Sequence, residues 1–421
     1  MNKPLLVFQA PVATRSGYGD HARDILKSLR KLDKFDIKIV PTRWGATPQN
    51  QLNPDDEFHM WILNNVAYSV NKRPDVFVQM SVANEFQPMG TYSIGITAGV
   101  ETTLTPQDFI TGANKMNLII TPSEFTKDGF VRALYQQIDN NTKQVVNEIK
   151  CTTPIEILFE GIDTDIFKKL DSVENSPIKD IETDFNFLFV GHWLPGDIGQ
   201  DRKDIGMMIK TFCGVFKSLP KDQQPGLILK TSLVGFSVID REEVRKRVDA
   251  ITREFGDKCP PIYLVFGDLL PAEMNKLYND DKVKAMVSFT KGEGYGRPLA
   301  EFAVTGKPIL VSNWSGPLDF LPKEYTTYLD GELTEVHPSA QNKFLLQGSK
   351  WYTVNYSKAA QKMYEVFKNY DSNLKRSSKL NEHIIEKFSI EAQDVRLKEI
   401  FDEYVKVKEY KPLQLPEIQK L

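Results

Sequence analysis

The ten residues 292–301, GEGYGRPLAE, combine three glycines, a proline and two glutamates. Glycine permits backbone angles that other residues resist, and it lets the main chain approach a ligand closely. Pro298 suits the first turn of a helix, and Gly306 is placed just past the end of that helix. We therefore predict a glycine-rich loop, a short helix and then a buried strand at KPILVS.

The start of this predicted helix offers unpaired N–H groups and a partial positive charge, which suit a phosphate or diphosphate. Glu293 and Glu301 would repel a phosphate, but their presence is explained if each accepts hydrogen bonds from sugar hydroxyls on either side of it. A nucleotide sugar has this layout of sugar, diphosphate, ribose and base. The alternative interpretation is a glycine-rich turn with both glutamates in solvent, because such motifs are weak without context.

Two other segments follow predicted strands and have the composition of ligand-binding loops. SGYGDHA (16–22) precedes the first helix, where a glycine turn exposes backbone amides, although a plain tight turn is the alternative. GHWLPGDIGQDRKDI (191–205) has the corresponding place in the second half of the chain. There Arg202 and Lys203 could neutralise a diphosphate leaving group, or form an ordinary basic pair on the surface.

Short apolar segments alternate with segments of helical periodicity along the whole chain. The predicted strands are 5–10, 35–41, 75–80, 92–97 and 118–123, and then 185–191, 227–233, 262–267, 283–289 and 307–312. The predicted helices include 21–32, a helix capped by Ser123, 203–219, 271–281 and a long helix from Ile390. This alternation predicts the α/β class with doubly wound parallel sheets, whose ligands bind outside the carboxyl ends of the strands. A polar stretch at 170–184 separates two Rossmann-like domains, predicted as 1–172 and 173–394.

Length and composition agree with this organisation. A chain of 421 residues is longer than most domains with a single hydrophobic core, so its length favours two domains. The chain has 53 Lys and Arg against 56 Asp and Glu without long blocks of one sign, so it lacks the charge pattern of a general nucleic-acid or membrane binder. Its three cysteines have no metal-ligand spacing and indicate reduced thiols. With no signal peptide and no apolar run of about 18 residues, we predict a cytoplasmic protein without a membrane span.

We also predict that no metal ion is bound. The five histidines have no ligand spacing. The sequence Asp163-Thr164-Asp165 falls in a predicted turn, where aspartates are common for reasons of turn geometry.

Together these segments resemble glycosyltransferase family four (glycosyl transferases group 1), which comprises retaining, nucleotide-sugar-dependent enzymes of the GT-B fold. Glu293 and Glu301 match the family's pattern of two glutamates separated by seven residues. FLFVG with RKDI, FGDLLPAEMNKLY, TPSEFTKDGF and ILFEGIDTDIF are also similar, and the likeness extends over residues 5–320. The resemblance implies two Rossmann-like domains facing a cleft, with a carboxyl-terminal helix at 395–421 that packs back on the first domain.

The resemblance also implies roles for the residues of the motif. Glu293 would hold the donor sugar, and the amides of Gly294, Tyr295 and Gly296 would hold its distal phosphate. Glu301 would bind the ribose hydroxyls.

Other positions follow from the same resemblance. Lys203, with Arg202 beside it, would stabilise the departing diphosphate without a metal ion, and Leu269 and Leu270 would lie near the base. A UDP-sugar is the expected co-substrate, with no other cofactor.

The amino-terminal half contributes the remaining candidates. Gly17, Tyr18 and Gly19 would close over the donor. His192 stands where the family usually has an arginine, and Glu101 stands where a histidine often lies at the reaction centre. Glu101 would polarise the acceptor hydroxyl or hold the donor sugar, with a buried structural carboxylate as the alternative.

The expected activity is transfer of a sugar to a glycan or small molecule, or to a hydroxymethylated DNA base. The last acceptor is suggested by the likeness of SGYGDHA and ITAGVETT to glycosyltransferases of tailed phages, and by Arg15, Arg23, Lys72 and Arg73. The near-neutral charge of residues 1–170 argues against a DNA acceptor. A nucleotide-sugar epimerase or hydrolase and a non-catalytic binding module are the alternative functions. The sequence predicts no oligomeric state.

Overall fold

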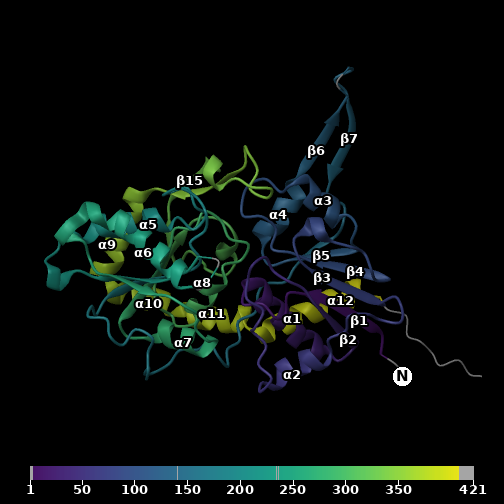
Figure 1. Ribbon diagram of the computed structural model, residues 1–421, viewed down its shortest axis with the longest axis horizontal. Helices are drawn as coiled ribbons and strands as arrows, with labels where there is room; N and C mark the ends of the chain where they lie inside the picture. The colour runs from purple at the N-terminus through teal and green to yellow at the C-terminus, as the bar shows by residue number, and fades with distance from the viewer. Residues whose placement is uncertain (1–2, 140, 234, 236, 407–421) are drawn as a thin grey trace, which may run out of the picture.

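The structure, a computed structural model, describes residues 3–139, 141–233, 235 and 237–406. It contains two six-stranded parallel sheets with helices around each, and the two units lie side by side (Figure 1). The strand orders are β2-β1-β3-β4-β5-β8 and β11-β10-β9-β12-β13-β14. The second order is that of a Rossmann fold. The predicted α/β class, with two doubly wound Rossmann-like domains, is therefore confirmed.

The four central strands of the first sheet are apolar segments buried on both faces, as parallel strands covered by helices are. Its strands are β1 (Leu5–Ala10), β2 (Asp36–Pro41), β3 (Val76–Met80), β4 (Tyr92–Ile96), β5 (Leu118–Thr121) and β8 (Ile155–Ile157). Its helices are α1 (Gly17–Leu32), α2 (Glu57–Asn64), η1 (Ala83–Glu85), α3 (Gln107–Ala113) and α4 (Glu124–Arg132). The predicted cap of α4 is present, because the Ser123 side chain accepts from the Thr126 amide.

The second sheet follows a linking segment, residues 158–185, that contains no helix or strand. Its strands are β9 (Asn186–Val190), β10 (Gly226–Lys230), β11 (Ile262–Val265), β12 (Val283–Ser288), β13 (Ile309–Ser312) and β14 (Thr327–Leu329). Its helices are α5 (Ile205–Phe216), η2 (Lys221–Gln223), α6 (Val238–Thr252), η3 (Arg253–Lys258), α7 (Pro271–Asn279), α8 (Arg297–Ala303), η4 (Gly316–Asp319), η5 (Pro338–Ala340), α9 (Tyr356–Lys368), α10 (Tyr370–Ser377) and α11 (Lys379–Phe388). A two-stranded sheet of β15 (Gly331–Glu335) and β16 (Lys350–Val354) lies beside it.

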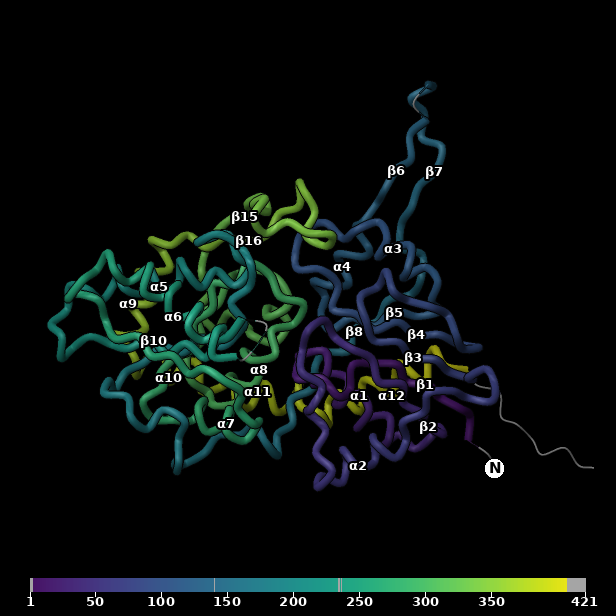
Figure 2. The backbone as a smooth tube through the Cα atoms, viewed as in Figure 1, coloured from purple at the N-terminus to yellow at the C-terminus, as the bar shows by residue number. Residues whose placement is uncertain are grey.

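The last described helix, α12 (Ile390–Tyr404), lies against the amino-terminal domain. Figure 2 shows this segment, in yellow, running beside α1. Leu397, Ile400 and Phe401 are buried in the same core as the side chains of β1 and α1. Arg396 Nη2 also donates to Glu156 Oε2 at 2.6 Å. Residues 407–421 of the segment expected to pack here lie outside the described residues.

A β-hairpin that the sequence analysis did not predict projects from the first domain. It consists of β6 (Leu134–Ile138) and β7 (Val145–Lys150), and it extends away from both sheets (Figures 1 and 2). Tyr135 anchors its base, because its hydroxyl donates to the Thr105 carbonyl oxygen at 2.6 Å.

The segment 16–22 is a helix start and not the glycine turn that we considered. Helix α1 begins at Gly17, four residues before the predicted start, because the Ser16 side chain accepts from the Gly19 amide at 3.1 Å and caps it. Gly17, Tyr18 and Gly19 therefore form the first turn of α1.

Candidate active site

The loops that follow β9 and β12 meet at the carboxyl ends of these neighbouring parallel strands. One loop comprises residues 191–204 and the other residues 289–296. The Lys291 amide donates to the Arg202 carbonyl oxygen at 2.7 Å and joins the two loops. Because β9 and β12 flank the point where the strand order reverses, these loops lie where open α/β sheets bind ligands.

Glu293 lies between these two loops and is 9% exposed. Its Oε1 atom contacts the Lys203 ammonium group and accepts from the Thr290 hydroxyl at 2.9 Å. Its Oε2 atom accepts from Arg202 Nη1 at 3.0 Å. Burial raises the pKa of this carboxyl, but Lys203 and Arg202 lower it further, so the pKa of Glu293 falls to about 2. The carboxylate is ionised and is paired with two cations from the facing loop.

Arg202 connects this ion pair to the amino-terminal domain. Its Nη1 atom donates to the Gly292 carbonyl oxygen at 2.6 Å, and its Nη2 atom lies 3.3 Å from Glu101 Oε1. The side chains of Arg202 and Lys203 are each 16% exposed. The structure thus brings together four residues that the sequence analysis singled out from three distant segments: Glu101, Arg202, Lys203 and Glu293.

The glycine-rich loop ends where α8 begins, as predicted. Gly296 has φ of 101°, a conformation that favours glycine, and α8 starts at Arg297 with Pro298 as its second residue. Gly306, with φ of 71°, follows the helix. The predicted strand at KPILVS is β13.

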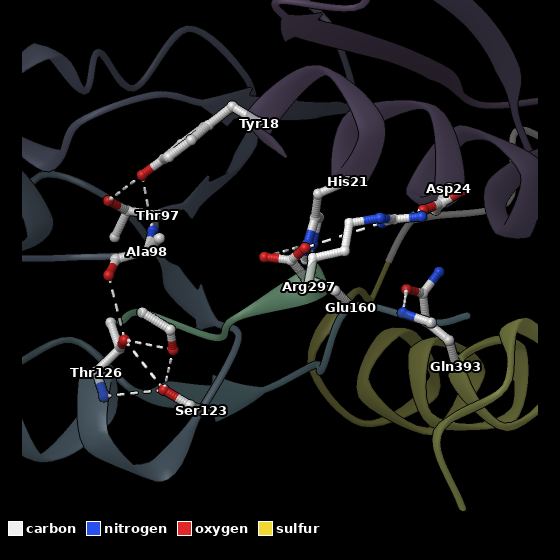
Figure 3. Close-up of polar contacts among 12 residues, drawn as sticks. Tyr18, His21, Asp24, Thr97, Ala98, Ser123, Thr126, Glu160, Arg297 and Gln393 are labelled. Carbon is white, nitrogen blue, oxygen red and sulfur yellow. Dashed lines mark hydrogen bonds and ion pairs between the residues drawn. The ribbon is translucent and has the colours of Figure 1, made fainter. Parts of the chain in front are cut away.

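Glycine is also needed in this loop because the amino-terminal domain approaches it closely. A Cβ atom at Gly294 would lie 2.9 Å from the Ala98 carbonyl oxygen. The Gly294 carbonyl oxygen accepts from the Ser123 hydroxyl at 2.5 Å. The Thr126 hydroxyl donates to the Ala98 carbonyl oxygen at 3.2 Å (Figure 3). Ser123 and Thr126 thereby bind two loops that meet here, the Gly294 loop of the second domain and the Ala98 loop of the first.

Tyr18 positions the loop that carries Glu101. Its hydroxyl oxygen accepts from the Ala98 amide at 2.8 Å and lies 3.5 Å from the Thr97 hydroxyl (Figure 3). The ring stacks on Trp44 with centroids 3.8 Å apart. Burial raises the pKa of Tyr18 to about 12, so the hydroxyl stays protonated. In this structure the Tyr18 hydroxyl oxygen contacts the Ala98 amide and the Thr97 hydroxyl.

Glu301, on α8, is held by two protein donors. Arg297 Nε donates to its Oε1 atom at 3.0 Å, and the Tyr278 hydroxyl donates to its Oε2 atom at 3.1 Å. Burial raises the pKa of Glu301 to about 7, and Arg297 opposes this shift only in part. This carboxyl therefore changes its charge near neutral pH, unlike Glu293.

Arg297 is a residue of this region that the sequence analysis did not single out. It begins α8 in the second domain and reaches the first domain, where its Nη1 atom lies 2.6 Å from Asp24 Oδ2 on α1 (Figure 3). The same atom lies 3.8 Å from Glu160 Oε2. Arg297 therefore links Glu301 to the amino-terminal domain.

Of the remaining predicted residues, His192 lies near the start of the loop 191–204, and Leu269 and Leu270 lie on the loop before α7. His192 is exposed, and its Nδ1 atom lies 3.0 Å from the Ser232 hydroxyl oxygen. Leu269 packs partly against the core of this domain, whereas Leu270 is 59% exposed just before α7. The loop that contains both leucines contacts the first domain through an ion pair between Asp268 and Arg15.

In the described parts of the chain, no group of three or more His, Cys, Asp or Glu side chains is arranged to hold a metal ion. No described helix is both long enough and apolar enough to span a membrane.

Comparison of this arrangement with solved structures identifies the fold. A glycosyltransferase from Rickettsia africae is 16% identical, and the match covers 97% of this chain and 100% of that one with a TM-score of 0.59. The chain has the GT-B fold. Sucrose-phosphate synthase from Thermosynechococcus elongatus matches with a TM-score of 0.61 and 12% identity over 96% of this chain and 99% of that one. HepE from Anabaena, in complex with UDP and glucose, matches with a TM-score of 0.57 and 11% identity over 95% and 100%. No protein-family model and no curated protein matches this GT-B chain.

Proposed function

We propose that this GT-B protein is a retaining glycosyltransferase of the family-four type, which moves a sugar from a nucleotide-diphosphate sugar to an acceptor hydroxyl. The observation that carries the proposal is the cluster of Arg202 and Lys203 with Glu293 at the carboxyl ends of β9 and β12. The shared fold with HepE, whose structure contains UDP and glucose, supports it.

The charges of the cluster suit a diphosphate. Arg202 offers a planar fork of donors and Lys203 a compact ammonium group, and both are largely withdrawn from water. A diphosphate that enters between the loops would compete with the Glu293 carboxylate for both cations. Low exposure strengthens these interactions, and fixed cations stabilise the charge that builds up on the leaving group in the transition state. In this proposal the two side chains supply the positive charge, and no metal ion is required.

The glycine-rich loop would bind the other end of the same group. The amides at Gly294, Tyr295 and Gly296 lie at the start of α8, where a partial positive charge favours a phosphate. Once Glu293 releases its cations, its carboxylate can accept hydrogen bonds from donor-sugar hydroxyls. Glu301 would accept hydrogen bonds from the ribose in the same way.

The reaction exchanges one bond for another at the anomeric carbon. The bond between that carbon and the diphosphate oxygen breaks, and the acceptor oxygen bonds to the same carbon on the same face. The acceptor proton passes to the departing phosphate oxygen. Glu101, which Arg202 holds beside the cluster, would orient the acceptor hydroxyl or the donor sugar.

We propose a UDP-sugar as the donor, because HepE was crystallised with UDP and with UDP-glucose. The acceptor would be a glycan, a small molecule or a hydroxymethylated DNA base. Three of the four cations considered for DNA already pair with a carboxylate: Arg15 with Asp268, Arg23 with Asp20 and Lys72 with Asp75.

The test is product analysis with a UDP-sugar labelled in its sugar, in the presence of free sugars, glycans, plain DNA and hydroxymethylcytosine DNA. Labelled acceptor supports the proposal. An altered nucleotide sugar would identify an epimerase, free labelled sugar a hydrolase, and an unchanged donor that nevertheless binds would identify a binding module. Transfer to modified DNA alone, falling steeply with added salt, would single out the DNA acceptor.

A further inference from the structure

A second charged pair lies directly behind the cluster of Arg202, Lys203 and Glu293. Lys291 Nζ is 3.1 Å from Asp204 Oδ2, and the two side chains are 1% and 0% exposed. Asp204 follows Lys203 in the chain, and Lys291 precedes Glu293 by two residues. The two loops that meet at Glu293 are thus joined a second time, out of reach of solvent.

Asp204 has a left-handed backbone conformation, which among residues other than glycine is found mainly for asparagine and aspartate. Its φ of 52° and ψ of 36° place it in the left-handed region immediately before α5. Such a conformation is strained for a residue with a Cβ atom, and such outliers cluster at functional sites. A buried ion pair adds a desolvation cost that often equals or exceeds its attraction. Apolar side chains of similar size would stabilise the fold equally well. The ion pair therefore points to a requirement for a fixed arrangement of the two loops.

The pair is held from both sides by groups of β16 and α9. The Tyr356 hydroxyl donates to Asp204 Oδ2 at 2.8 Å, and Lys291 Nζ donates to the Thr353 hydroxyl oxygen at 2.9 Å. The Tyr352 amide donates to the Lys291 carbonyl oxygen at 2.9 Å. Lys291 is therefore fixed through its main chain and its side chain.

We propose that Lys291 and Asp204 are positioning residues of the donor site. Their buried pair fixes the separation of the two loops, so that Arg202 and Lys203 face Glu293 and, in the complex, the diphosphate. Neither residue touches the donor. This inference rests on the proposed function, because the positioned groups are those assigned to the diphosphate.

The variant that tests this is Lys291→Met in the full chain, because methionine fills similar space without the charge. Burial raises the pKa of Asp204 and Lys291 opposes that shift, so the variant leaves a carboxyl without its cation. The double variant Lys291→Met with Asp204→Asn removes both charges. The matched control is Lys282→Met, a partly buried lysine at the opposite end of β12 that bonds to the Ile181 carbonyl oxygen.

Three quantities are measured for each protein: the melting temperature, the UDP dissociation constant by calorimetry, and amide hydrogen exchange in residues 201–204 and 290–293. We expect Lys291→Met to weaken UDP binding about tenfold or more and to speed exchange in both loops, since small displacements of binding groups are costly. The double variant should regain melting temperature and still bind UDP weakly. Lys282→Met should lower the melting temperature without changing UDP affinity.

Each other outcome contradicts the inference. Unchanged exchange in both loops would show that the pair does not position them, whatever the protein binds. Recovery of UDP affinity together with stability in the double variant would show a purely structural role. Failure of the unaltered protein to bind UDP, GDP or ADP would overturn the proposed function, and the assignment of these two residues to a donor site would fail with it.

Discussion

Lys203 and Glu293, 90 residues apart in the chain, form a partly buried ion pair at the carboxyl ends of two neighbouring strands. Each side chain comes from a loop that also contacts the other loop through its main chain. The contact therefore depends on the register of β9 against β12, and it places opposite charges at the carboxyl edge of the second sheet.

Replacement of Lys203 by alanine should lower turnover of the labelled UDP-sugar by about 100-fold or more, because a cation at the leaving group acts mainly in the transition state. Initial rates of UDP release measure this. Lys210→Ala, an exposed lysine on α5 that pairs with Glu254, is the control and should behave as the unaltered protein. Equal rates of UDP release for both variants would show that Lys203 does not take part in the reaction.

Replacement of Glu293 by glutamine should change the pH dependence of stability. The pKa of Glu293 falls from 4.5 to about 2 on folding, which corresponds to about 3 kcal/mol of stabilisation. Because the folded pKa is the lower one, this stabilisation is present above pH 4.5 and is lost as the pH falls toward 2. Urea unfolding of both proteins should show a difference at pH 6 that narrows steadily at pH 4 and below. A difference in the free energy of unfolding that does not change with pH would mean that the ion pair does not stabilise the ionised form of Glu293.

Glu301 should show the opposite pH dependence. Its pKa rises from 4.5 to about 7, so its protonated form stabilises the fold fully below pH 4.5, and that stabilisation is lost as the pH rises through 7. Ribose hydroxyls donate to the ionised carboxylate, so UDP affinity should rise over the same range. Calorimetry between pH 5.5 and 8.5 measures this.

The control for that experiment is Glu301→Gln, which should bind UDP with little pH dependence. Glu301→Ala should weaken binding by about 1 to 3 kcal/mol, the cost of unpairing charged hydrogen bonds, and should still fold. If the alanine variant keeps the affinity of the unaltered protein, Glu301 does not bind the ribose.

Chelation should leave the activity unchanged. EDTA removes divalent ions, whereas Arg202 and Lys203 stay in place and supply the charge for the diphosphate. UDP release is followed with EDTA, and again after addition of manganese. Activity that disappears with EDTA and returns with manganese would contradict the metal-free mechanism and direct attention to Asp163 and Asp165.

The sequence predicts ten of the twelve strands in the two parallel sheets, and it predicts α1, α4, α5, α7, α8 and α12, because each of these elements has a strong local signal. Continuous apolar segments mark the parallel strands, and the cap at Ser123 marks the start of α4. The glycines and Pro298 mark the turn into α8. The start of α1 was placed four residues late because Gly17 and Gly19 were interpreted as turn residues, whereas the Ser16 cap decides the helix start.

The hairpin of β6 and β7 was not predicted because its strands are mostly exposed, including apolar residues such as Leu134 and Val145, so their sequence carries little pattern of burial. Arg297, Lys291 and Asp204 were missed for a different reason. The Lys291–Asp204 and Arg297–Asp24 pairs join segments 87 and 273 residues apart, and the local sequence does not indicate either pair. The convergence of Arg202, Lys203 and Glu293 could be expected, because their loops follow strands that the Rossmann order places side by side.

The central claim is that the loops after β9 and β12 bind the diphosphate of a nucleotide sugar. The most direct measurement is calorimetric titration of UDP into the unaltered protein and into Lys203→Ala, at pH 7.5 in EDTA. We predict saturable binding to one site in the unaltered protein and an affinity at least about tenfold lower in the variant, since a charged hydrogen bond is lost. Equal UDP affinity in the two proteins, or no binding of UDP, GDP or ADP to the unaltered protein, would contradict this account.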